Sequence, residues 1–117
     1  MFTDDEFARG RALFDAGAYW EAHEAWEGPW RKERRSWQQG LIQVAAAFYK
    51  LVTKEDVEAA RRILARAVVK LEAESEGDAR APTAAFIAAV ERCREAIDHL
   101  DDADAFDRAL VPRFANR

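Results

Sequence analysis

The sequence predicts an all-α protein, folded as a compact antiparallel bundle of about four to five helices. In several segments apolar residues recur at spacings of three and four, which is the period of an amphipathic helix. No segment shows the apolar-polar alternation of a strand, and no Asn-Gly or Asp-Gly pair marks a hairpin turn. The segments between the predicted helices are only a few residues long, which favours antiparallel neighbours.

The first predicted helix covers about residues 4–16. Thr3 followed by Glu6 resembles a capping box at its start, because the two side chains can satisfy each other's backbone N–H groups. Gly17 suits the left-handed backbone that often ends a helix. The apolar face of this helix holds Phe7, Gly10 and Phe14.

The second helix begins near Ala18 or Tyr19. We expect it to end by Gly28 and Pro29, because proline disfavours helical geometry in the residue before it. With 100° per residue, one face of this helix collects three aromatic residues, a histidine and a carboxylate. These residues are Tyr19, His23, Trp26, Glu27 and Trp30.

Three later helices follow the same period. The third, at about residues 32–52, is strongly apolar and is the expected centre of the bundle. The fourth follows Thr53 and Asp56, which resemble a second capping box, and ends at Gly77. Pro82 suits the first turn of the fifth helix. The three core faces hold Trp37, Leu41, Val44, Phe48 and Leu51; Val57, Ala60, Leu64, Ala67, Val68 and Leu71; and Phe86, Val90, Cys93, Ile97 and Leu100.

Length and composition predict one domain. The chain of 117 residues is 50% hydrophobic and 34% charged, which is a globular balance, and its length suits a single core. We assign residues 1–117 to this domain, with the bundle at about residues 3–100 and a partly docked tail at residues 101–117. The stretch Glu76–Ala81 resembles a linker, but we expect a loop, because too little chain follows it for a second core.

Composition also narrows the partners and the compartment. A formal net charge of −4 repels polyanions, so neither nucleic acid nor an anionic membrane is an expected partner. Cys93 is the one cysteine, and the acidic N-terminus and the lack of a long apolar run give no export or membrane signal, so we expect a cytoplasmic protein. Four apolar tail residues could cover the bundle or dock a second subunit, as in a homodimer: Phe106, Leu110, Val111 and Phe114.

The pair of His23 and Glu27, one helical turn apart, is the most informative polar feature. A carboxylate on an otherwise apolar face is costly to bury unless it is paired, and an imidazole one turn away is a suitable partner. Two interpretations stay open. The pair could bind a metal or act as an acid and base, with the tryptophans excluding water and shifting pKa values. Alternatively, it could fix the helix against its neighbours, which is the commoner role in helical bundles.

As a metal site this motif is incomplete. The segment from His23 to Glu27 is similar to the His-Glu-x-x-His zinc helix, but Glu27 stands in place of the second histidine. A catalytic zinc ion needs three protein ligands, and His99 projects away from the core face of its helix. The di-iron carboxylate pattern would need a glutamate where Trp20 stands.

Two glutamines of the third helix are further candidates. Gln39 and Gln43 lie one turn apart, roughly opposite Leu41. They could face solvent, or they could meet His23 and Glu27 across the helix interface. The sequence does not decide between these two arrangements.

Taken together, the motifs in the first half of the chain resemble those of the family called domain of unknown function 309. The resemblance extends more loosely through Leu71 and implies a compact helical fold, but no activity comes with it. Many relatives carry a histidine where this chain has Lys50, and that departure counts against a metal site needing a second histidine there. The motif positions are the turn at Gly17–Tyr19, His23, Glu24, Glu27, Trp30, Gln39 and Gln43.

The sequence therefore favours a non-enzymatic binding or scaffold module with a buried polar network of His23, Glu27 and the glutamines. The alternative is a metal-dependent hydrolase, in which His23 and Glu27 bind a divalent metal ion and Glu24 activates water. In that case Gln39 or Gln43 would polarise the substrate, and the two neighbouring tryptophans would limit solvent access. Those tryptophans are Trp26 and Trp30. No substrate, ligand or partner is specified.

Overall fold

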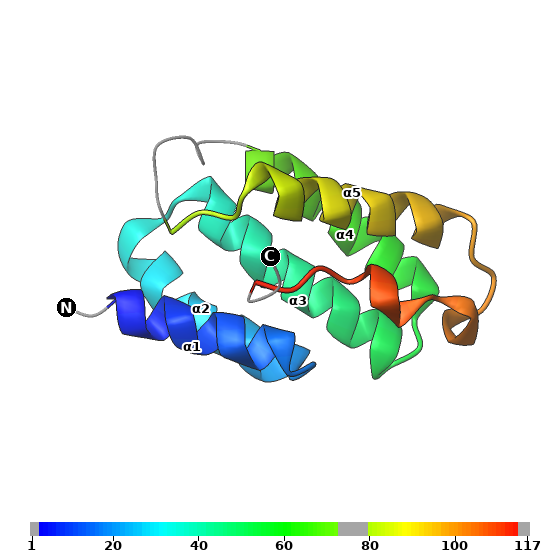
Figure 1. Cartoon of the computed structure of the whole chain (residues 1–117), viewed down its shortest axis with the longest axis horizontal. Helices are drawn as coiled ribbons and strands as arrows, with labels where there is room; N and C mark the ends of the chain where they lie inside the picture. Colours follow the sequence, from blue (N-terminus) through cyan, green and yellow to red (C-terminus); the bar gives the residue numbers. More distant parts are fainter. Residues whose placement is uncertain (1–2, 73–79, 115–117) are drawn as a thin grey trace.

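In the part of the chain that the structure describes, five α-helices run in alternating directions (Figure 1). The computed structural model describes residues 3–72 and 80–114, and for residues 3–5 it describes the backbone alone. No strand occurs in these two ranges, so the predicted all-α bundle is confirmed. The elements are α1 (Thr3–Asp15), α2 (Tyr19–Glu33), α3 (Ser36–Val52), α4 (Val57–Glu72), α5 (Ala84–Asp98) and the short 3-10 turns η1 (Ala103–Ala105) and η2 (Arg108–Leu110).

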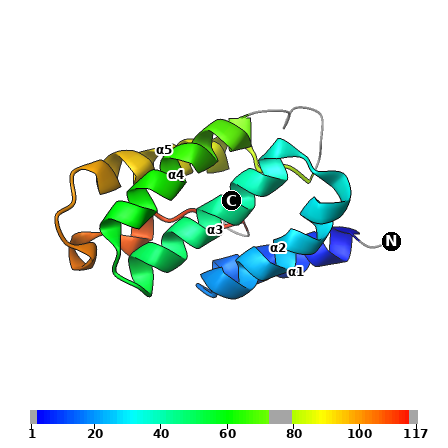
Figure 2. The same ribbon diagram turned by 180° about the vertical axis from the view of Figure 1, so that it is seen from behind.

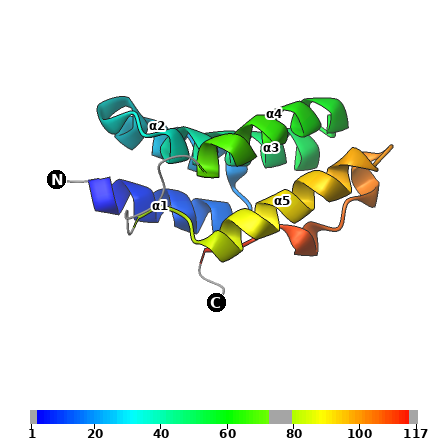
Figure 3. The ribbon, with the colours of Figure 1, turned by 90° about the horizontal axis from the view of Figure 1, so that it is seen from above.

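The helices form two layers, and α3 is the centre of the first. It packs against α2 and against α4, and Figure 2 shows this layer from behind. α1 packs on α2 and α5 packs on α4, and Figure 3 shows α1 and α5 together on the other side of that layer. The C-terminal segment, residues 101–114, runs back between α1 and α5 (Figure 1). This segment therefore completes the second layer.

Aromatic side chains fill the space between the layers. Phe7 and Phe14 of α1, Trp26 of α2 and Phe48 of α3 are at most 1% exposed. The ring centroid of Phe14 lies 6.0 Å from that of Trp26 and 6.1 Å from that of Phe48. At Gly10 a Cβ atom would come within 2.2 Å of the Trp26 indole nitrogen. The close contact between α1 and α2 therefore requires glycine at this position.

The core faces predicted for the three later helices are confirmed except at their ends. Val57 is the first residue of α4, and Leu100 lies beyond the last residue of α5, so both are only half-buried. The other predicted core residues are buried: Trp37, Leu41, Val44, Phe48 and Leu51; Ala60, Leu64, Ala67, Val68 and Leu71; and Phe86, Val90, Cys93 and Ile97.

The predicted end of α2 at Gly28 and Pro29 is wrong, because the helix continues to Glu33. A proline inside a helix lacks its own N–H donor, and its ring crowds the Cβ and backbone of the residue before it. That residue is Gly28, which has no Cβ, and the ring of Pro29 is buried. The residue that terminates the helix is the next one, Arg34, whose φ of 58° is left-handed. As a consequence α3 begins at Ser36, later than predicted.

Other helix ends match the predictions in part. Gly17 has a φ of 83° after α1, as expected for a left-handed end. Thr53 terminates α3 rather than capping α4, and Asp56 alone accepts a hydrogen bond from a backbone N–H in the first turn of α4. Thr83 caps α5 by accepting from a backbone N–H at 3.1 Å, so Pro82 precedes the cap instead of standing in the first turn.

Some predicted boundaries lie outside the described residues. They are the side chain of Thr3 in the first capping box, the end of the fourth helix at Gly77, and residues 76–79 of the predicted loop. Within residues 3–72 and 80–114, no helix combines the length and the apolar character needed to cross a membrane.

The C-terminal segment is docked in the gap between α1 and α5. Phe106 is buried against Phe48, with ring centroids 6.3 Å apart. Phe114 stacks on Phe86 at 4.3 Å, and its backbone N–H donates a hydrogen bond of 2.8 Å to Asp15. These contacts connect the end of the described chain to α1, α3 and α5.

Candidate functional site

The predicted pair of His23 and Glu27 forms on the flank of α2. Ala22, Trp26 and Pro29 point into the core, which leaves the histidine and the carboxylate at the edge of the buried face. His23 Nε2 lies 3.3 Å from Glu27 Oε2, and the two side chains are 16% and 32% exposed. The pair is therefore half-open to solvent rather than sealed in the interior.

Glu27 has a second partner, whereas His23 is paired with Glu27 alone among the described residues. Glu27 Oε1 accepts a hydrogen bond of 3.3 Å from Arg31, one further turn along the helix. His23 Nδ1 is buried and has no hydrogen-bond partner among the described residues. A buried polar atom without a partner destabilises the folded state by about 1–3 kcal/mol, so the cluster is not a closed network.

Trp20 is the site residue that the sequence reasoning missed. Its indole stacks on the imidazole of His23, with ring centroids 4.6 Å apart and planes tilted by 26°. It also contacts Tyr49 of α3 at 4.8 Å, yet it is 42% exposed. The signal was present in the sequence, because a residue three positions before His23 lies on the same helical face.

The two predicted glutamines are half-buried on α3 but do not bond to the pair. In the described part of the chain, no hydrogen bond joins Gln39 or Gln43 to His23 or Glu27. The Oε1 atom of Gln43 is buried and also lacks a partner.

The two predicted tryptophans have different surroundings. Trp26 is fully buried, and its indole N–H donates a hydrogen bond of 3.3 Å to the backbone carbonyl of Phe7. Trp30 is half-buried, and the guanidinium of Arg34 lies 4.6 Å from its ring centroid. Only Trp30 therefore offers part of its surface to a ligand, whereas Trp26 holds α1 and α2 together.

A second polar cluster, which the sequence reasoning did not find, connects three distant segments. Gln38 of α3 is fully buried and donates a hydrogen bond of 2.9 Å to Glu33 at the end of α2. Arg80 donates to both oxygens of the same carboxylate, at 2.9 and 2.8 Å. The Gln38 side chain also accepts from the backbone N–H of Arg35. We call Glu33, Gln38 and Arg80 the buried network after its buried member, Gln38; the side chains of Glu33 and Arg80 are 28% and 26% exposed.

Among the described residues, the candidate metal ligands remain the two side chains of His23 and Glu27. Among the described residues, no group of three histidine, cysteine, aspartate or glutamate side chains is close enough together to hold one ion. Glu24 is exposed on the outer side of α2, and Arg31 already contacts the carboxylate of Glu27. A bound cation would have to compete with this guanidinium.

Two further side chains are excluded as reactive groups. Cys93 is buried and donates to the backbone carbonyl of Leu110, and this burial raises the pKa of its thiol to about 12. The thiol is therefore neutral and is a poor nucleophile. His99 is exposed at the end of α5, away from the pair on α2.

Comparison with known proteins identifies the first half of the chain. The chain matches none of the curated proteins and none of the solved structures with which it was compared. Residues 7–63 match the model of a family described as "Domain of unknown function (DUF309)". The matched residues cover most of α1, all of α2 and α3 and the start of α4, and they include every candidate site residue of α2 and α3. Over these residues, the chain belongs to the DUF309 family.

Proposed function

We propose that this protein is a non-enzymatic binding module that uses one face of α2 to bind a partner chain. The α2 face consists of Trp20, His23 and Glu27. The observation that carries the proposal is the exposed indole of Trp20, stacked on a histidine whose Nδ1 has no partner. A purely structural pair would have its buried polar atoms satisfied and its large aromatic residue covered.

The exposed tryptophan supports a protein partner. Tryptophan is among the residues that contribute most to protein interfaces, because a large ring is buried at small entropic cost. Further along α2 from Trp20, Glu27 and Arg31 supply charged groups at the margin of the contact.

Charge along α2 favours a second copy of this chain as that partner. The first half of the helix carries exposed Glu21 and Glu24, and its last turn carries exposed Arg31 and Lys32. In a two-fold symmetric dimer the α2 face of one subunit meets the α2 face of the other, so the two α2 helices run in opposite directions. The acidic half of one helix then lies against the basic half of the other.

Sedimentation equilibrium of the full chain at concentrations up to about 200 µM tests this proposal. We expect Trp20→Ala to weaken self-association at least tenfold, which corresponds to about 1.4 kcal/mol. Val69→Ala is the matched control, because Val69 is 67% exposed on α4, outside the α2 face. Monomers at every concentration would contradict the homodimer, and equal weakening by both variants would contradict the α2 face.

The metal-dependent hydrolase is the competing function for the same residues. It requires a third ligand beyond His23 and Glu27, supplied by a second subunit or by residues outside the described ranges. Calorimetric titration of zinc, manganese and nickel into the wild type and His23→Ala separates the two functions. Binding tighter than about 0.1 mM that disappears in His23→Ala would favour the hydrolase.

A further inference from the structure

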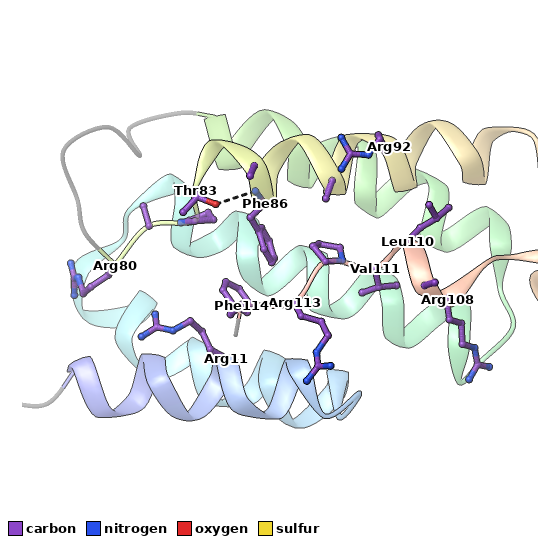
Figure 4. A pocket seen from close by; sticks show the side chains of 16 residues that line it. Arg11, Arg80, Thr83, Phe86, Arg92, Arg108, Leu110, Val111, Arg113 and Phe114 are labelled. Carbon is purple, nitrogen blue, oxygen red and sulfur yellow. Dashed lines mark hydrogen bonds between the residues drawn. The ribbon is translucent and has the colours of Figure 1, made fainter. Parts of the chain in front are cut away.

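A groove of about 910 Å³ lies in the second layer, on the side of the bundle formed by α1, α5 and the C-terminal segment. Its walls come from α1, the segment before α5, the first half of α5 and residues 108–114 (Figure 4). Apolar side chains line the groove between its charged groups, among them Phe86, Leu110 and Val111. Leu110 is 37% exposed, so part of this apolar surface is open to solvent.

The charged groups of the groove all have the same sign. No aspartate or glutamate is among the described residues that line it. This is notable in a chain with 22 acidic and 18 basic residues, where a random surface would carry more carboxylates than cations. The arginines that line the groove are Arg11, Arg80, Arg92, Arg108 and Arg113.

Four of the five arginines of the groove differ from other arginines nearby in having no carboxylate partner among the described residues. Arg61 pairs with Glu58 and Asp98, and Arg94 pairs with Glu91 and Asp98. Arg80 belongs to the buried network. Within residues 3–72 and 80–114, the side chains of the other groove arginines make no ion pair and no hydrogen bond. These groove arginines are Arg11, Arg92, Arg108 and Arg113.

Unpaired guanidinium groups along an apolar groove point to a particular ligand chemistry. Each guanidinium can bind a carboxylate through two parallel hydrogen bonds, and the apolar walls can bury alkyl side chains. The cations are spread along the groove, since the α5 wall alone from Ala85 to Arg92 is about 10 Å long at 1.5 Å per residue. One small anion cannot reach all of them.

We propose that this groove binds an acidic peptide segment of a partner protein, with apolar side chains between its carboxylates. In this arrangement Arg11 and Arg113, which stand on either side of the space between α1 and the C-terminal segment, bind one end of the peptide (Figure 4). Arg92 and Arg108 bind carboxylates of the peptide further along the groove. Leu110 and Val111 contact the apolar side chains of the peptide.

A nucleic acid fits the same groove less well. The net charge of −4 repels a long phosphate backbone, whereas a short peptide brings only a few charges. Single-stranded nucleic acid also needs free aromatic faces for its bases. Here the rings of Phe86 and Phe114 stack on each other at 4.3 Å, so each covers a face of the other.

The groove is independent of the α2 face. The groove is built from α1, α5 and the C-terminal segment, whereas Trp20 and His23 belong to α2 in the other layer (Figure 3). A variant in one surface therefore leaves the residues of the other in place. Failure of the homodimer test says nothing about the groove, and the reverse is also true.

Fluorescence anisotropy with the full chain tests the groove directly. The probe is a fluorescein-labelled peptide of about six residues that alternates glutamate and leucine, a length that spans about 20 Å when extended. The comparison ligands are the same peptide with glutamine in place of glutamate, and an oligothymidylate of equal length. Binding is measured at low and at high salt, because charge-assisted contacts weaken as ionic strength rises.

Two double variants decide the result. We expect Arg11→Gln with Arg113→Gln to weaken binding of the glutamate peptide at least tenfold. The control is Arg62→Gln with Arg66→Gln, which removes two exposed arginines from α4 outside the groove and leaves binding unchanged. Arg11 is partly exposed and the other three arginines are exposed, so circular dichroism is expected to show folded protein in both variants.

Three results would overturn this proposal. The first is a glutamate peptide that binds no more tightly than about 1 mM at low salt, or no more tightly than its glutamine counterpart. The second is an equal loss of binding in the groove variant and the control variant. The third is tighter binding of the oligothymidylate than of the peptide, which would identify the groove as a nucleic-acid site.

Discussion

The two polar clusters of this bundle differ in how completely their atoms are bonded. In the buried network, Gln38 is fully buried and both oxygens of Glu33 accept hydrogen bonds from Arg80. In the α2 face, His23 and Glu27 are partly exposed and one imidazole nitrogen has no partner. The first cluster joins the end of α2, the start of α3 and the segment before α5. The hydrogen bonds of the first cluster are satisfied, whereas the second cluster leaves one nitrogen atom without a partner among the described residues; we propose a structural role for the first and a binding role for the second.

This contrast lies in the completeness of the hydrogen bonds and not in residue type or in exposure alone, because the side chains of Glu33 and Arg80 are 28% and 26% exposed. Both clusters contain a glutamate and lie on or next to α2. A buried and satisfied network stabilises one packing arrangement, because each group would be unpaired in any other. A partly exposed pair with an unpaired atom contributes little to the free energy of unfolding, so altering it destabilises the protein only slightly. Stability measurements on matched variants can therefore test the distinction.

The largest effect is expected from Gln38→Ala. The change leaves a cavity, removes a partner of the Glu33 carboxylate and frees the backbone N–H of Arg35. We expect the free energy of unfolding to fall by about 2–4 kcal/mol. Urea denaturation followed by circular dichroism measures it. A loss below about 0.5 kcal/mol would remove the structural role that we assign to the buried network.

A smaller and pH-dependent effect is expected at Cys93, a buried polar group that has one hydrogen bond. Burial raises the pKa of this thiol from 9.0 to about 12 in the folded chain. Because the folded state holds the proton more tightly than the unfolded state, the stabilisation is complete below pH 9.0 and is lost as pH rises toward about 12. The slope is at most about 1.4 kcal/mol per pH unit.

Cys93→Ala provides the comparison for this pH dependence. Burial also raises the pKa of Tyr19, with a smaller contribution from the charge of Cys93, so only the part of this shift that comes from burial cancels in the difference. We expect urea denaturation between pH 8 and pH 11 to show a steeper loss of stability in the wild type. Parallel curves for the two proteins would show that the thiol is not protected by burial.

A still smaller effect is expected from His23→Asn and Glu27→Gln. Each change alters a pair that is 16% and 32% exposed, and one of its nitrogen atoms is already unsatisfied. We expect each variant to lose less than about 1 kcal/mol of unfolding free energy. A loss of 2 kcal/mol or more, comparable to that of Gln38→Ala, would place the pair among structural groups and would break the contrast.

The smallest effect is the coupling between His23 and Glu27 themselves. A double-mutant cycle with His23→Asn and Glu27→Gln isolates this term, and we expect about 0.3–0.5 kcal/mol for an i, i+4 pair at the surface. The coupling should decrease in 1 M salt, because the pair is partly exposed. A coupling above about 1.5 kcal/mol that resists salt would indicate a desolvated pair.

Several features of the candidate site could be predicted from local sequence. The spacing of His23 and Glu27 placed them on one helical face, and the structure brings them to 3.3 Å. The same spacing would have identified Trp20, three residues before His23. The end of α2 could not be predicted from Pro29 alone, because the absence of a Cβ on Gly28 and the burial of the proline ring both reduce the usual penalty.

The sequence by itself determined the helices, their core faces and the family of residues 7–63, because these depend on periodicity and on motifs within a few turns. The tertiary structure alone decided which polar groups became partners. Glu33 meets Arg80 across 47 residues, and Phe114 bonds to Asp15 across 99. The arginines of the groove likewise come from α1, α5 and the C-terminal segment. Such contacts depend on how helices pack, and no local pattern along the chain encodes that arrangement.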